Sequence, residues 1–189
     1  MSHREGLDHD DDLLFRRQDI NPGLKRKLMH IATGQGQDME LVGEYRISAP
    51  RETVWLALND PDILKQCIPG CESVEKLSDT EFKANIVLAI GPVKAKFAGK
   101  GLLSDFDPPN SYKITGEGSG GIAGFGKGTA DVKLVQDGSE TILQYSAKAQ
   151  VGGKIAQLGS RLVEATCRKL AEQFFGKFAS AVSSASGAT

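Results

Sequence analysis

Histidine, the side chain that most often moves protons near neutral pH, is almost missing from this sequence. The 189 residues include three histidines, His3, His9 and His30, and all three precede residue 39. From residue 39 onward the chain therefore lacks a histidine general base, a Ser-His-Asp triad and histidine metal ligands. The sequence predicts no catalytic residue of these kinds, no metal site and no cofactor.

Cysteine, excess charge and long apolar runs are also scarce. Three cysteines without an export signal predict a reducing, cytoplasmic setting. Three residues separate Cys67 from Cys71, unlike the two of thioredoxin-like and zinc motifs, so we interpret this pair as part of a structural turn and Cys167 as a buried thiol. The formal net charge of −1 argues against nucleic-acid binding. No apolar run of about 18 residues is present, so no membrane-spanning helix is predicted.

Composition divides the chain into three parts. Residues 1–38 contain the acidic run Asp10–Asp12 and little periodic apolar pattern, so we expect a disordered N-terminal extension. A role of this extension in binding a partner or a membrane stays open. Residues 39–182 are expected to form one ligand-binding domain with a sizeable core. Residues 183–189 are small and polar, and we expect them to form a disordered tail.

The longest periodic stretch runs from Lys154 to about Val182. Its apolar side follows helical spacing through Ile155, Leu158, Leu162, Thr166, Leu170, Phe174 and Phe178. A helix of about 29 residues is about 43 Å long, and it needs a wide apolar surface to lie on. Gly159 falls on the apolar side, where it indicates either close approach of another backbone or space for a group that is not protein.

Shorter elements precede this helix. A strand is expected at Leu41–Ser48, followed by two short helices, one beginning near Pro50 and one capped by Asp60 with Pro61 as its first residue. Six further strands, separated by turn residues, are expected at 72–77, 81–90, 93–105, 111–117, 121–136 and 141–151. Connections this short allow hairpins but no crossover helices. The pattern therefore predicts an α+β fold with the long helix across one curved antiparallel sheet.

Alternation along the strands sorts their side chains onto two faces. One face collects lysines, namely Lys83, Lys94, Lys96, Lys100, Lys127, Lys133 and Lys148. The other face is apolar and small in its middle, with Gly99, Gly101, Gly116, Gly126, Gly128, Ala130, Ala147 and Ala149. Two interpretations stay open. Either the sheet bends sharply and the helix packs onto its backbone, or the small residues leave an apolar chamber beneath the helix.

The candidate ligand-binding residues come from the apolar faces of these elements. They are Trp55, Leu58, Ile68, Ile86, Leu88, Phe97, Tyr112, Ile114, Tyr145, Leu158, Leu162 and Thr166. Trp55, Leu58 and Ile68, together with Ile63, either hold the two short helices against the sheet or form a lid. Tyr112 and Tyr145 are either core tyrosines or hydrogen-bond partners of a ligand carbonyl. No pair of carboxylates is expected to face inward, so the pattern favours a binding site without catalysis.

Several motifs resemble those of one known family. They include Ala49-Pro50, Asp60-Pro61, Ile68-Pro69-Gly70-Cys71-Glu72, Ile90-Gly91-Pro92-Val93 and the stretch from Gly152-Gly153-Lys154 to Arg161-Leu162. In these motifs, and from Met39 to about Val182 as a whole, the sequence resembles the carbon monoxide dehydrogenase G-subunit family of the START/Bet v 1-like (SRPBCC) superfamily. The resemblance implies a helix-grip fold, in which a curved antiparallel sheet wraps the C-terminal helix around a hydrophobic cavity.

The resemblance also implies an accessory role beside molybdenum-dependent carbon monoxide dehydrogenases and similar hydroxylases. Members are associated with recruiting the enzyme to the membrane and with binding a quinone or a similar lipid. Many carry an apolar anchor after the long helix, whereas residues 183–189 here are small and polar. The expected protein is a cytoplasmic carrier, with a peripheral contact at the inner face of the membrane left open. Its expected partners are a quinone or lipid and molybdenum hydroxylase subunits.

Two other functions stay open at this stage. One is an enzyme of the same fold that acts on an aromatic or polyketide-like compound, with Tyr112 or Tyr145 at its site. The other is an assembly factor that grips another protein chain and carries no small molecule, for which a tightly packed interior is expected.

Overall fold

Residues 37–187 are described by the computed structural model. They form β1 (Gln37–Ile47), α3 (Arg51–Leu58), α4 (Pro61–Cys67), β2 (Cys71–Lys76), β3 (Glu81–Ile90), β4 (Val93–Asp107), β5 (Ser111–Ser119), the 3-10 helix η2 (Gly121–Ala123), β6 (Phe125–Asp137), β7 (Glu140–Gly152), α5 (Lys154–Gln157) and α6 (Ser160–Ser186). The hypotheses about residues 1–36 lie outside this range.

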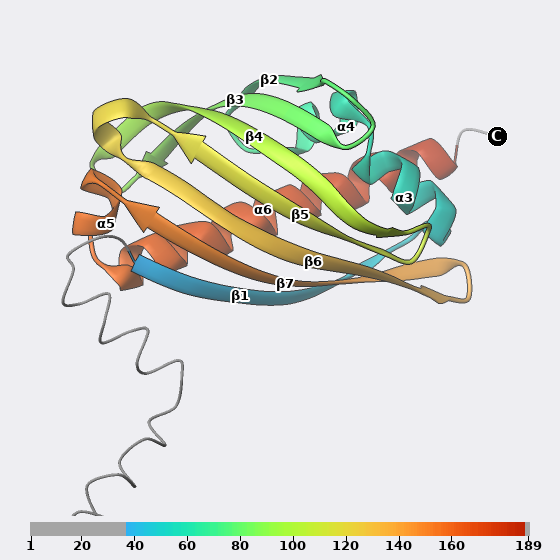
Figure 1. Ribbon diagram of the computed structural model, residues 1–189. Coiled ribbons are helices and arrows are strands. Elements are labelled where there is room, and N and C mark those ends of the chain that lie inside the picture. The colour runs from blue at the N-terminus through green and yellow to red at the C-terminus, as the bar shows by residue number, and fades with distance from the viewer. Residues whose placement is uncertain (1–36, 188–189) are drawn as a thin grey trace, which may run out of the picture. The chain divides into compact units, whose positions relative to one another are not determined.

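The seven strands form one antiparallel sheet in the order β1-β7-β6-β5-β4-β3-β2. Strands β2 to β7 follow one another as a meander, and β1 closes the sheet against β7. Helix α6 packs against β1 and β3, near opposite edges, because the sheet curves around the helix. Figure 1 shows α6 behind the sheet, with α3 and α4 toward one end and α5 at the other. The predicted α+β helix-grip fold is confirmed.

Local sequence signals account for the two short helices. The Asp60 carboxylate accepts hydrogen bonds from the backbone N–H groups of Asp62 (2.9 Å) and Ile63 (3.4 Å), and Pro61 is the first residue of α4. A side-chain oxygen at this position satisfies donors that the first helical turn leaves free, which contributes about 1 kcal/mol to helix stability. The predicted cap of α4 is confirmed.

The strand register confirms the two faces predicted from alternation. Phe97 on β4 lies opposite Ile86 on β3, and Gly101 lies opposite Gly116 on β5. Strand β1 extends the same inner face, because Gly43 lies opposite Tyr145 on β7. The inner face of β1 therefore carries Met39, Leu41, Gly43, Tyr45 and Ile47.

The densest part of the core lies where α3, α4 and the C-terminal half of α6 meet the sheet. Its fully buried side chains include Ile47, Leu134, Leu143, Phe178 and Val182. Thr141 is the buried polar residue of this region, and its hydroxyl donates to the carbonyl of Ala49 at 2.7 Å. This end of the domain is therefore a packed core.

The prediction of one continuous helix from Lys154 to Val182 is wrong at Gly159. Helix α5 ends at Gln157 and α6 begins at Ser160, with Gly159 between them at φ +95° and ψ 145°. This conformation is essentially restricted to glycine, so Gly159 separates two helices rather than letting one helix approach a neighbour. Within α6 itself, Val163 is fully buried whereas Leu162 is 39% exposed. Each step of four residues drifts by about 40° around a helix, so the predicted series from Leu162 to Phe178 does not stay on one side.

Other boundaries also differ from the prediction. Strand β1 begins at Gln37, so residues 37 and 38, expected to belong to the disordered extension, pair with β7. The strand expected from residue 121 begins at Phe125, because Gly121 (φ +64°) and Gly124 (φ +122°) turn the chain through η2 instead. At the C-terminal end, α6 continues to Ser186, so residues 183–186 are helical rather than part of a disordered tail.

Candidate functional site

The inner face of the sheet is buried unevenly. Toward α3 it is packed, with Leu103 7%, Tyr112 4% and Val132 7% exposed. In the middle of the same face, side chains that point toward α6 remain only half-buried: Ala84, Ile86, Leu88, Phe97, Ile114, Ala130, Tyr145 and Ala147. A filled protein interior at ordinary packing density buries such side chains completely. Their remaining accessible surface therefore borders space that protein atoms leave free.

The inner-face glycines show where this space lies. A Cβ atom added to Gly101 would meet no atom within 4 Å, and one added to Gly116 would meet only the carbonyl oxygen of Lys100 on the adjacent strand, at 3.7 Å. At Gly99 the nearest atoms are likewise carbonyl oxygens of the neighbouring strands. The interpretation in which α6 packs directly onto this backbone is therefore wrong at these glycines. Above them the inner face is open.

Aromatic side chains close the interior toward α3. Trp55 contacts Tyr112 edge to face, with ring centroids 5.3 Å apart, and Phe106 flanks both rings. Leu58 is buried in the core cluster that Trp55 borders. Burial raises the pKa of the Tyr112 phenol well above its ordinary value, so this ring stays neutral. In this structure these residues pack the short helices against the sheet, which is one of the two predicted roles.

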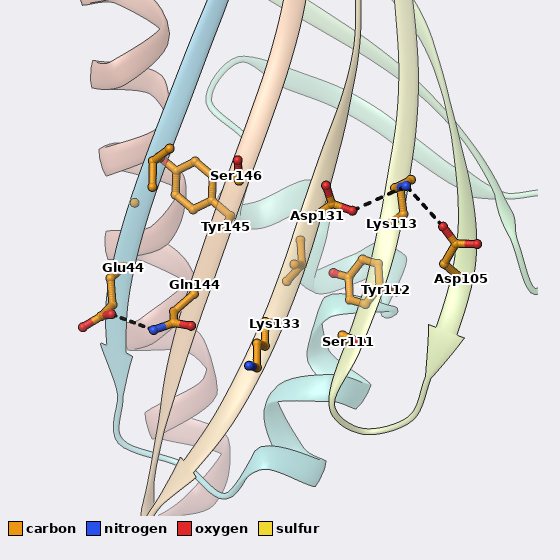
Figure 2. Close-up of a pocket in the computed structure, with 13 residues that line it drawn as sticks. Glu44, Asp105, Ser111, Tyr112, Lys113, Asp131, Lys133, Gln144, Tyr145 and Ser146 are labelled. Atoms are coloured by element: carbon orange, nitrogen blue, oxygen red, sulfur yellow. Dashed lines mark hydrogen bonds and ion pairs between the residues drawn. The ribbon is translucent and has the colours of Figure 1, made fainter.

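A second aromatic cluster lies along β1, β7 and α6. Phe175 stacks on Tyr45 and Tyr145, with centroid separations of 4.3 Å and 5.3 Å. The Tyr145 ring lies over Gly43, where any side chain would collide with it. Figure 2 shows Tyr145 leaning from β7 toward β1. Desolvation raises the pKa of the Tyr145 phenol, whereas Arg168 lowers it.

Sequence reasoning missed Tyr45 and Phe175. The alternation of β1 carries the signal for Tyr45, because Met39, Leu41, Tyr45 and Ile47 share its parity. Phe175 lies beside the predicted apolar side of the helix, and its role depends on the tertiary contact with the two tyrosines.

The other predicted lining residues gather nearer α5. Ile86 and Phe97 are half-buried partners on β3 and β4, and Leu88 is two residues further along β3. Leu158 and Leu162 lie against Gly91 in the turn between β3 and β4. Leu162 is 39% exposed, so it lies at the mouth of the interior and not in its middle, contrary to its predicted place on the buried side of the helix.

Three further candidates lie between these groups. Ile68 follows α4 and is half-buried, and Ile114 packs against the core cluster from β5. Thr166 is half-buried, and its hydroxyl donates to the Leu162 carbonyl at 2.8 Å. Because this bond lies within α6, the Thr166 hydroxyl is already used by its own helix.

A separate groove of about 540 Å³ crosses the outer face of β1 and β4 to β7. Figure 2 shows Lys113 between Asp105 and Asp131, and its Nζ lies 3.3 Å and 3.7 Å from their carboxylates. The hydrogen bond to Asp105 and the attraction of Asp131 raise the pKa of Lys113. This groove is open to solvent, and charged and polar side chains make up most of its lining residues, so it is not the enclosed chamber predicted beneath the helix.

Titratable groups are not concentrated in the interior. Within residues 37–187, no cluster of histidine, cysteine and carboxylate side chains is arranged to hold a metal ion. Burial raises the pKa of the Cys67 thiol, and Cys71 begins β2 after the turn that follows α4. No helix within residues 37–187 has the length and apolarity needed to cross a membrane.

Seven antiparallel strands curved around a long C-terminal helix define the helix-grip class of Bet v 1-like proteins. The Zhui aromatase/cyclase from Streptomyces sp. R1128 shares this fold at 12% identity and a TM-score of 0.59, with 78% of this chain and 94% of that chain covered. Norcoclaurine synthase from Thalictrum flavum shares it at 15% identity and a TM-score of 0.53, over 80% and 90% of the two chains. These likenesses establish the fold.

The family follows from closer similarity. Residues 43–183 match the family model of the carbon monoxide dehydrogenase G-subunit (CoxG), and the chain belongs to that family. A conserved protein from Geobacillus kaustophilus is 32% identical, with a TM-score of 0.73 and coverage of 77% of this chain and 96% of that chain. No curated protein sequence matches the chain significantly.

Proposed function

We propose that this protein is a non-catalytic accessory protein that shelters an apolar ligand, a quinone or a lipid, beneath α6 for a molybdenum-type carbon monoxide dehydrogenase or a related hydroxylase. Membership of the CoxG family supports the enzyme system. The observation that carries the ligand proposal is the open space above Gly101, at the centre of an apolar inner face.

The twelve predicted residues have different roles in this proposal. Ile86, Leu88, Phe97, Ile114 and Leu158 line the apolar wall, with Tyr145 and Thr166 beside it. Trp55, Leu58, Ile68 and Tyr112 close the end near the short helices, and Leu162 lies at the opposite mouth. Each buried methylene contributes about 0.8 kcal/mol to binding, so an isoprenoid or acyl chain needs no charged partner inside. A peripheral contact with the membrane gives such a carrier access to its ligand.

The single tryptophan provides a direct binding test. Trp55 lies against Tyr112 where the interior closes, so a quinone bound in the chamber should quench its emission. We expect saturable quenching on titration with decylubiquinone, and recovery of the emission when palmitate, which has no quinone ring, is added as a competitor. An excess of free tryptophan amide corrects for collisional quenching.

Three outcomes separate the alternatives. Saturable quenching with competition supports the carrier. Quenching that grows linearly and is not reversed by palmitate contradicts it and favours a ligand-free assembly factor. Turnover of an aromatic or polyketide-like compound that is lost in Tyr112→Phe or Tyr145→Phe contradicts the non-catalytic assignment.

A further inference from the structure

The α5 end of the domain exposes three large apolar side chains. Ile122 in η2 is 85% exposed, Phe125 at the start of β6 is 43% exposed and Leu162 in α6 is 39% exposed. Isolated exposed apolar residues are common, but three on adjoining segments at one end form an arrangement typical of an interaction site. We call Ile122, Phe125 and Leu162 the apolar tip.

The segments that carry the apolar tip are packed together. The Phe125 ring lies over Gly152, and a Cβ atom on Gly124 would lie 3.1 Å from Ile155 in α5. The loop itself is closed by a hydrogen bond from the Gly120 N–H to the Gly124 carbonyl at 2.9 Å, and Ala123 is buried beside Ile122. Ile122 is thus held outward by an ordered turn.

Positive charge accompanies the tip. Lys94 follows the β3–β4 turn, Lys154 begins α5 and Arg161 lies in the first turn of α6, and all three side chains are exposed. None of them takes part in an ion pair with another residue of 37–187. Glu164, three residues after Arg161 on α6, is engaged by Arg168 at 2.8 Å.

We propose that the α5 end docks onto a lipid bilayer that contains anionic headgroups, with the apolar tip inserted at the interface and Lys94, Lys154 and Arg161 beside the headgroups. Apolar side chains flanked by cations suit such an interface, because the apolar side chains enter the acyl-chain boundary while the cations contact the anionic headgroups. A bilayer can accept a tip formed by three separate segments without having a complementary shape. A protein partner would need a surface that matches the tip.

This inference rests on the proposed function and extends it. Leu158, which the proposed function places on the apolar wall, and Leu162, which belongs to the tip, both lie against Gly91. The mouth of the interior and the docking surface are therefore next to each other. An apolar ligand that passes between bilayer and chamber at this end avoids exposure to water.

Vesicle co-sedimentation tests the surface. The full chain is mixed with vesicles of phosphatidylcholine alone or with phosphatidylglycerol added, at low and high salt. We expect binding to the anionic vesicles that weakens with salt, and at least about a tenfold loss of affinity in Ile122→Asp. The matched control is Leu56→Asp, since Leu56 is 70% exposed on α3 and lies away from the tip; it should bind like the unaltered protein.

The outcomes that overturn this inference differ from those that overturn the proposed function. Absence of binding to anionic vesicles, an equal loss in Leu56→Asp, or unchanged binding in Ile122→Asp overturns membrane docking. A purified partner enzyme that binds through Ile122 while vesicles do not also overturns it. Decylubiquinone supplied in solution should still quench Trp55 in Ile122→Asp. If decylubiquinone in solution does not quench Trp55 in the unaltered protein, the ligand proposal is wrong. The vesicle result is not affected by that outcome.

Discussion

Replacing Gly101 by phenylalanine should weaken decylubiquinone binding at least about tenfold, equivalent to about 1.4 kcal/mol, without unfolding the domain. Gly101 faces the interior, a Cβ there would meet no atom within 4 Å, and its backbone is outside the left-handed region. A phenyl group therefore enters free space and occupies volume that the ligand needs. Because the ring buries apolar surface as it does so, the melting temperature should stay equal or rise.

The control for this variant lies on the same strand. Ala98 is exposed on the outer face of β4, so Ala98→Phe adds the same ring outside the chamber and should leave ligand affinity unchanged. Equal affinity of Gly101→Phe and the unaltered protein would contradict the placement of the ligand. A large loss of stability in Gly101→Phe would show that the space above Gly101 is already filled.

Gly159→Ala should destabilise the protein by about 1–3 kcal/mol, although a Cβ at this position meets no atom within 4 Å. The cost comes from the backbone, because φ +95° with ψ 145° is a conformation that alanine avoids. In a continuous helix the same change would stabilise the protein by about 1 kcal/mol, so the sign of the effect distinguishes a broken helix from an unbroken one. Urea unfolding measures it.

Gly176 supplies the matched control on the same element. It is exposed within α6, and a Cβ there also meets no atom within 4 Å, but its backbone is helical. Gly176→Ala should therefore stabilise the protein by about 0.5–1 kcal/mol. Stabilisation by both substitutions would mean that α5 and α6 form one helix in solution.

Short-range signals predicted most of the fold because they act locally. The Asp60 side chain caps the helical turn that Pro61 begins, and the four consecutive residues from Asp60 to Ile63 are enough to predict this cap. Alternation fixed the inner and outer faces, since a one-residue error in register would expose the whole apolar set. The register of β3 with β4 and of β5 with β6 accordingly matches the predicted faces.

The missed features depend on contacts that periodicity does not encode. Ile155, Leu158 and Leu162 keep helical spacing across Gly159, so the pattern gives no sign of the break. Val163 rather than Leu162 lies on the buried side of α6, because a four-residue spacing drifts by about 40° per step around a helix. The stack of Tyr45, Tyr145 and Phe175 joins residues up to 130 positions apart, and the outer groove joins side chains of five strands.

A shared fold does not by itself establish shared chemistry. The aromatase/cyclase and norcoclaurine synthase that resemble this chain are 12% and 15% identical to it, which supports the same backbone and nothing finer. The inner face of the sheet in this chain provides an apolar wall with neutral tyrosine side chains. Tyr112, with its raised pKa, is poorly suited to act as a base at neutral pH. This composition agrees with a carrier.

Native mass spectrometry of the full chain, purified without detergent and followed by organic extraction, tests the central claim most directly. The account predicts a population heavier than the bare polypeptide by the mass of one apolar molecule, which the extract then yields as a quinone or lipid. The same population should be depleted in Gly101→Phe and retained in Ala98→Phe. A spectrum of bare protein only, both as purified and after incubation with decylubiquinone, would contradict the account.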